Sequence, residues 1–70
     1  MNREYVESSV LVSFGFDAAI STLEVEFRRG AIWQYFDVPE SVYYEMKSAS
    51  SFGKFFRQRI KGHYSESQVG

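Results

Sequence analysis

The spacing of apolar residues changes once along this 70-residue chain, at Pro39. Before Pro39, apolar and polar residues alternate, which is typical of strands with one buried face. After it, apolar residues recur at helical spacing, and proline favours the first position of a helix. The sequence predicts strands at residues 8–17, 22–28 and 31–36, and helices at residues 39–48 and 51–61.

Each of these elements has one apolar face, so each must cover another. The sequence therefore predicts an α+β fold, a three-stranded antiparallel meander with two C-terminal helices packed on one face. We expect a single domain at residues 8–64. Residues 1–7 and 65–70 are expected to form flexible termini, because they show neither pattern.

The loop around Gly30 decides which side chains of the second hairpin are buried. A two-residue loop would place Gln34 in the core, and burying an unpaired amide costs about 1–3 kcal/mol. A three-residue loop beginning at Arg28 puts glycine at the left-handed position of a bulged turn. It leaves Gln34 on the outer face beside Glu24 and Glu26, and we expect this register. The inward pairs that it predicts are Phe27–Ala31, Val25–Trp33 and Leu23–Tyr35.

Aromatic side chains are expected to form much of the core. The chain has seven Phe, five Tyr and one Trp but no Cys, which excludes disulfides and thiolate zinc sites. A domain this small has a limited core, so bulky rings must supply much of its buried area. The predicted core consists of Val12, Phe14, Leu23, Val25, Phe27, Trp33, Tyr35, Val42, Met46, Phe52, Phe56 and Ile60.

Catalytic and metal-ligating combinations are scarce. His63 is the one histidine, and near a flexible end it is interpreted as a solvated side chain. Glu24 and Glu26 share an outer strand face and are interpreted as solvated charges rather than an acid–base pair. We therefore expect no enzymatic activity, no cofactor and no metal. No segment approaches the roughly 18 apolar residues of a membrane span, so we expect no membrane association and a cytoplasmic location.

Charge is unevenly distributed along the chain. Residues 1–46 have three arginines and eight acids, whereas residues 47–63 have five cations and no acid. On a helical wheel, Lys54, Arg57 and Lys61 fall within one sector, opposite the apolar side of the second helix. This basic stripe could bind phosphates. The alternative is a solubilising helix face whose cations favour the C-terminal end of the helix dipole.

Arg59 points instead into the apolar sector of that helix. Three interpretations stay open: its head snorkels at the helix end, it pairs with an acid, or it stacks on a ring such as Trp33 or Tyr35.

Some rings are expected on the surface. Tyr44 falls on the polar side of the first helix, and Ile32 and Phe36 lie on the outer sheet face. Aromatic residues on an open sheet can stack on bases. Here Glu24 and Glu26 share that face and would repel phosphates, so it better suits a protein partner.

The chain resembles the KTSC domain family in three runs of residues. They are Ser8-Ser9, then Leu23-x-Val25-x-Phe27-x-x-Gly30-x-x-Trp33-x-Tyr35-x-x-Val38-Pro39, then Ala49-x-Ser51-x-Gly53-x-x-Phe56-x-x-x-Ile60-x-x-x-Tyr64. The family occurs at the C-terminus of some lysyl-tRNA synthetases and as small stand-alone bacterial proteins. The resemblance implies RNA binding through that association. The family's Tyr-x-Tyr pair corresponds to Trp33 and Tyr35, so the first hydroxyl is replaced by an indole.

Two functions are predicted from these observations. The first is a small non-enzymatic module that binds nucleic acid, expected to be RNA, through Lys54, Arg57 and Lys61. The alternative is a protein-interaction module, self-associating through its acidic sheet and basic helix surfaces.

Overall fold

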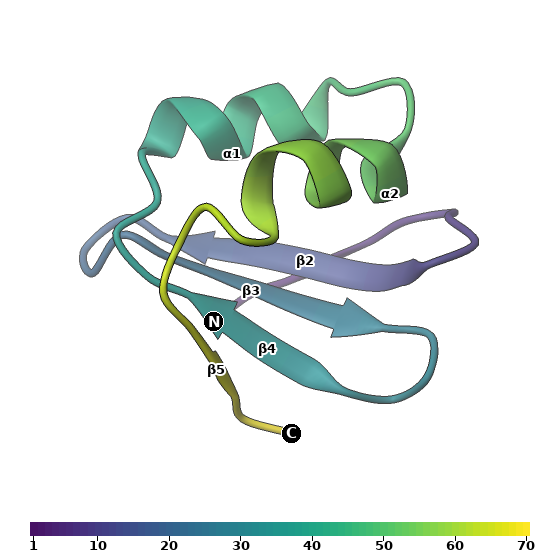
Figure 1. Cartoon of the computed structure of the whole chain (residues 1–70), viewed down its shortest axis with the longest axis horizontal. Helices are drawn as coiled ribbons and strands as arrows, with labels where there is room; N and C mark the ends of the chain where they lie inside the picture. The colour runs from purple at the N-terminus through teal and green to yellow at the C-terminus, as the bar shows by residue number, and fades with distance from the viewer.

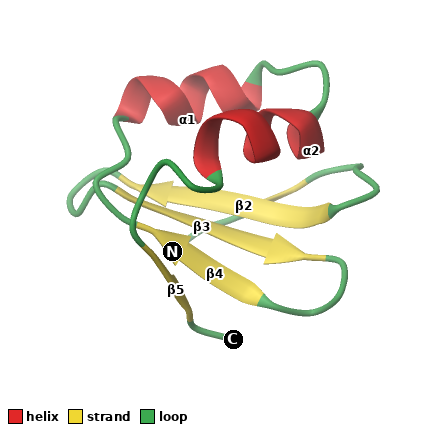
Figure 2. Ribbon diagram, viewed as in Figure 1, coloured by secondary structure: helices red, strands yellow, loops and turns green.

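The computed structural model describes all 70 residues and has two layers, an antiparallel sheet and two helices that cover one of its faces (Figure 1, Figure 2). The strands are β1 (Glu4–Tyr5), β2 (Leu11–Asp17), β3 (Thr22–Phe27), β4 (Ile32–Tyr35) and β5 (Glu66–Gln68). The helices are α1 (Glu40–Lys47) and α2 (Phe52–Phe55), and α2 continues directly into a π-helical segment, η1 (Phe56–Ile60). The predicted α+β class is confirmed.

The prediction of three strands is wrong, because the sheet has five, in the order β1-β2-β3-β4-β5. The two additional strands are short edge strands formed by the chain's ends, β1 against β2 and β5 against β4. Every residue of both is exposed, so neither shows the alternation of buried and exposed positions that identifies a strand in a sequence. Backbone pairing places them there, with an ion pair between Glu4 of β1 and Lys47, and whether these ends are flexible stays a prediction.

The predicted register of the β3–β4 hairpin is confirmed. Leu23 pairs with Tyr35 and Val25 with Trp33, and the Phe27 N–H donates to the Ala31 carbonyl at 2.9 Å. The three-residue loop ends at Gly30, whose φ of +99° is the left-handed conformation that such a turn requires.

The core lies between the sheet and the helices and is dominated by rings. Phe56 packs edge-on against both Phe27 and Tyr35, with centroids 5.1 and 5.5 Å apart. Of the predicted core residues, Trp33 and Phe52 are only half-buried. The buried apolar residues are Leu11, Phe14, Leu23, Val25, Phe27, Tyr35, Val38, Val42, Met46, Phe56 and Ile60.

Val12 is a second error in the predicted core. Leu11 lies opposite Phe27 and Ser13 lies opposite Glu26, so the strand contains one extra residue at Val12, a β-bulge. The bulge turns Leu11 inward and fully buries it, while Val12 is half-buried.

The second helix is not the regular α-helix predicted for residues 51–61. Ser51 caps α2 by accepting from the Lys54 N–H at 3.2 Å. From Phe56 on, the turns widen, and the Lys61 N–H donates to the Phe56 carbonyl at 2.9 Å, an i to i+5 bond. Lys61 itself leaves the helix with an extended backbone. A wheel drawn at α-helical pitch therefore misplaces the side chains that follow Phe56.

The outer face of the sheet is partly covered by the N-terminal segment. The Arg3 guanidinium lies 3.3 Å from a Glu24 oxygen and 3.8 Å from a Glu26 oxygen. The two acids also accept from Gln34 and Ser13, at 2.9 and 3.0 Å. The interpretation of these carboxylates as solvated charges is therefore wrong, because they form an ion-paired network with an arginine.

Gly15 allows this segment to cross the sheet. A Cβ at Gly15 would lie 2.2 Å from the Asn2 carbonyl oxygen and 3.0 Å from the Arg3 Cγ.

Gly15→Ala should therefore displace residues 2–3 and lower the free energy of unfolding by about 1–3 kcal/mol, measured by urea denaturation. In a chain lacking residues 1–5 the same substitution should have little effect. An equal loss in both chains would contradict the proposed cause.

Candidate nucleic-acid interface

A groove of about 560 Å³ opens beside the second helix, between η1, the β3–β4 loop and β5. Its volume falls within the range of about 300–1,000 Å³ that is usual for small-molecule sites. Four aromatic rings and four cations line it, together with Ser9, Val10 and Glu66. The rings are those of Phe27, Trp33, Tyr35 and Phe56, and the cations are Arg28, Arg29, Arg57 and Lys61.

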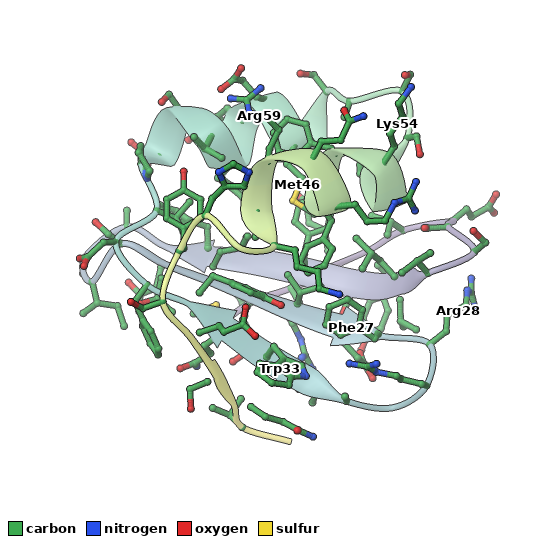
Figure 3. The ribbon with its side chains drawn as sticks, viewed as in Figure 1. Phe27, Arg28, Trp33, Met46, Lys54 and Arg59 are labelled. Atoms are coloured by element: carbon green, nitrogen blue, oxygen red, sulfur yellow. The ribbon has the colours of Figure 1, made fainter.

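Three separate parts of the chain bring these cations together. Arg28 and Arg29 belong to the hairpin loop, Arg57 to η1, and Lys61 to the extended backbone that follows η1. Figure 3 shows Phe27 between β3 and the second helix, with Arg28 pointing outward from the hairpin end. The Arg28 N–H donates to the Val10 carbonyl at 3.0 Å and its Nε donates to the Ser8 carbonyl, which ties the loop to the start of β2.

The eight cations of the chain divide into two groups by their pairing. Arg3, Lys47 and Arg59 each form an ion pair, with Glu24 and Glu26, Glu4 and Glu45 respectively. No acid lies within 4.0 Å of the other five. Those five all line either the groove or a smaller adjoining pocket of about 340 Å³, and they are Arg28, Arg29, Lys54, Arg57 and Lys61. Arg57 lines both.

All three residues of the predicted basic stripe belong to this unpaired group. The structure divides them, since Lys61 lines the groove, Lys54 lines the smaller pocket, and Arg57 lies between them. Sequence reasoning missed Arg28 and Arg29, which are distant in the chain. The sequence could have indicated them, because both lie in the tight turn between two strands that contain aromatic residues, and such a turn exposes its side chains at the end of the sheet.

Trp33 and Tyr35 differ although they face the same side of the sheet. Tyr35 is 3% exposed and packs against Phe56, so its ring is core. Trp33 is half-buried, and its Nε1 is shielded from solvent without a hydrogen-bond acceptor. A buried donor without a partner costs about 1–3 kcal/mol, so the unpaired Trp33 N–H is an unusual feature of the packing beside the groove.

Arg59 pairs with an acid, which is one of the three interpretations left open. Its guanidinium lies 3.2 Å from a Glu45 oxygen and 5.1 Å from the centroid of the Phe55 ring. Figure 3 shows it at the top of the helix layer, away from Trp33. The wider turn of η1 explains why it is exposed rather than in the apolar sector.

The remaining candidates lie apart from the groove. Tyr44 is exposed beside Tyr43 and Lys47, and Ile32 and Phe36 are half-buried. His63 is exposed in the turn after η1. No three His, Asp or Glu side chains come together as metal ligands would. The helices are all too short or too polar to cross a membrane.

A family model described as the KTSC domain matches residues 7–64. The chain belongs to the KTSC family. It is 42% identical to a small protein of Stutzerimonas stutzeri over 65 residues, 91% of this chain and 92% of that protein. The crystal structure of a KTSC domain protein from Yersinia pestis has a TM-score of 0.96 and 38% identity, covering 99% of this chain and 97% of that one.

Longer relatives contain the same domain as a small part. The chain is 36% identical to the lysine–tRNA ligase of Nostoc punctiforme over 63 residues, which are 90% of this chain but 11% of the ligase. The ligase of a second Nostoc strain matches at 35% over the same share of its length. KTSC is not a known catalytic family.

Most KTSC motif positions have architectural roles in this chain. The Ser8 Oγ accepts from the N–H groups of Val10 and Leu11, at 3.2 and 3.3 Å. Gly53 lets α2 approach that segment, since a Cβ there would lie 3.3 Å from the Val10 side chain. Ser51 caps α2. Trp33 is the motif residue whose polar atom has no structural partner.

Burial raises the pKa of Tyr35 to about 12, the Glu66 carboxylate adds to the shift, and Arg29 opposes it. A folded-state pKa above the ordinary value of 10.0 favours the folded state at pH values below 10. That stability is lost as pH rises toward 12, so the urea midpoint should fall across this range. Tyr35→Phe should make the fall shallower without abolishing it, because burial also raises the pKa of Tyr43. Tyr5→Phe, at an exposed ring, is the control; identical profiles for all three proteins would refute the assignment.

Proposed function

We propose that this KTSC domain is a small non-enzymatic module that binds single-stranded RNA in its basic groove. The segregation of charge is the observation that supports it. All five cations without an acid partner lie along two adjoining pockets, whereas the other three are neutralised locally. These pockets contain two carboxylates, Glu7 and Glu66, so three positive charges are in excess.

The groove favours a single strand over a duplex. Proteins that bind single strands combine a positively charged groove, which follows the backbone, with aromatic side chains that contact unstacked bases. Here the half-buried Trp33 lies in the same groove as Arg28, Arg29, Arg57 and Lys61. RNA duplexes are bound mainly through phosphates and 2′-hydroxyls across a wide shallow surface, which needs no aromatic lining.

The relatives support RNA over other polyanions. Lysine–tRNA ligases, by name, act on a tRNA, and two of them contain a region 35–36% identical to this chain. An RNA ligand would also place this protein in the cytoplasm.

The alternative, self-association through an acidic sheet and a basic helix, has weaker support. Glu24 and Glu26 are paired with Arg3, so the outer sheet face offers little free negative charge to a basic partner surface.

Removing two groove cations should reduce the salt dependence of RNA binding. Each phosphate contact to a single strand contributes about 0.7 to the slope of log K against log salt. Arg57→Ala with Lys61→Ala should therefore lower that slope by about 1–2, measured by fluorescence anisotropy with a labelled oligouridine. The matched control is Lys47→Ala with Arg59→Ala, which removes the same two residue types from ion pairs outside the groove. It should leave the slope unchanged.

Three results would decide against the proposal: no salt-dependent binding by the wild type, equal binding by the groove variant, or an equal loss in the control. Adding Lys54→Ala to the groove variant tests the smaller pocket and should lower the slope further. All of these residues are exposed, so the fold should be retained, which far-ultraviolet circular dichroism can verify.

Trp33 offers an internal reporter because it is the one tryptophan of the chain. Binding of oligouridine should change its fluorescence, since bases enter the groove that its ring lines. Inorganic polyphosphate, which has charges but no bases, should bind in a salt-dependent way and leave the emission nearly unchanged. An equal change with both ligands would show that the ring does not contact bases.

A further inference from the structure

One carboxylate lies in the groove among the cations. Glu66, on β5, lines the groove together with Arg28, Arg29, Arg57 and Lys61, and it forms no ion pair with any of them. None of its side-chain oxygens accepts a hydrogen bond from another residue. It is exposed, so a bound molecule can reach it. In a groove that binds only phosphates, an unpaired acid lowers the affinity. Glu66 therefore needs a different role.

The sheet register places Glu66 on the same face as the unpaired indole donor. Tyr35 pairs with Glu66 across β4 and β5, and Trp33 pairs with Gln68. Directly opposite residues share a face, so Glu66 lies diagonally across from Trp33 on the face that the helices cover. The Glu66 carboxylate also raises the pKa of the Tyr35 hydroxyl, in keeping with their opposite positions on β5 and β4. The groove therefore presents the two acceptor oxygens of Glu66, which have no partner in the protein, beside the Trp33 ring, whose Nε1 is shielded from solvent.

Among the four RNA bases, guanine matches this set of groups. A carboxylate accepts two hydrogen bonds side by side, and guanine offers two adjacent donors, N1–H and the N2 amino group, next to the O6 acceptor. Adenine and cytosine each place a ring-nitrogen acceptor beside their amino group, and uracil places its single N–H between two carbonyls. Each of these would set an acceptor against the carboxylate.

We propose that the groove binds an unpaired guanine of single-stranded RNA, with Glu66 accepting from its N1–H and N2 amino group beside the Trp33 ring. The guanidinium groups of Arg29 and Arg57 supply charge for the flanking phosphates and planes for stacking. This specificity rests on the proposed function of the same groove.

The ligands that test it are short labelled oligouridines with one central guanosine, adenosine or inosine. Inosine keeps N1–H and O6 but lacks the N2 amino group. By fluorescence anisotropy, the guanosine strand should bind about fivefold or more tightly than the adenosine strand, with inosine between them. Equal affinity for guanosine and adenosine would overturn the guanine assignment.

Glu66→Gln separates base recognition from charge. It removes a negative charge from a basic groove, so the plain oligouridine should bind equally or more tightly, while the preference for guanosine over adenosine should fall to near one. Glu40→Gln makes the same charge change at an exposed position outside the groove and should keep the preference. A preference that survives Glu66→Gln would show that another group reads the base.

These measurements also separate the two proposals. Salt-dependent binding of all strands with no base preference would leave RNA binding standing and refute guanine recognition. No binding of any strand at low salt would refute both.

Discussion

The left-handed backbone at Gly30 determines the register on which the site depends. A three-residue loop pairs Val25 with Trp33 and Leu23 with Tyr35, so the aromatic pair faces the helices. A slip of one residue would exchange the two faces of β4 and bury Gln34 in place of those rings. The same loop exposes Arg28 and Arg29 at the end of the sheet, where they meet the second helix across the groove. One turn thus sets both the aromatic lining and half of the basic lining.

In the helix layer, Phe56 fixes the position of the second helix on the sheet. Its ring contacts Phe27 and Tyr35 edge-on, which anchors the point where α2 becomes η1. The chain then widens to i to i+5 bonding, and Lys61 leaves in an extended conformation. Functional sites often coincide with such π-helical turns because they redirect side chains that a regular helix would place elsewhere. Here Arg57 and Lys61 line the groove with Trp33 rather than forming an outward stripe.

Features governed by local chemistry could be predicted from the sequence, and features governed by backbone pairing could not. The β3–β4 register followed from the cost of burying Gln34 and from the backbone freedom of Gly30, both local properties. The edge strands β1 and β5 bury no side chain, so no pattern marks them. The bulge at Val12 inserts one residue into an alternation that otherwise reads as regular. Half of the groove's cations were identified, and the others were missed because the turn and the helix meet only in the folded chain.

Ion pairing determines which ligands this surface attracts more than the net charge of the chain does. The formal charge of the chain is −1, which on its own argues against a polyanion ligand. Screening limits the influence of exposed charges to about 8–10 Å at physiological salt, so a phosphate responds to the cations beside it rather than to the total. Arg3 neutralises acids on the far face of the sheet, and Lys47 and Arg59 neutralise Glu4 and Glu45. Four of the nine acids thus pair with cations away from the groove, and the groove keeps four cations that form no ion pair. In the RNA recognition that we propose, the lone carboxylate weakens the binding of phosphates but distinguishes one base from another, as selectivity requires.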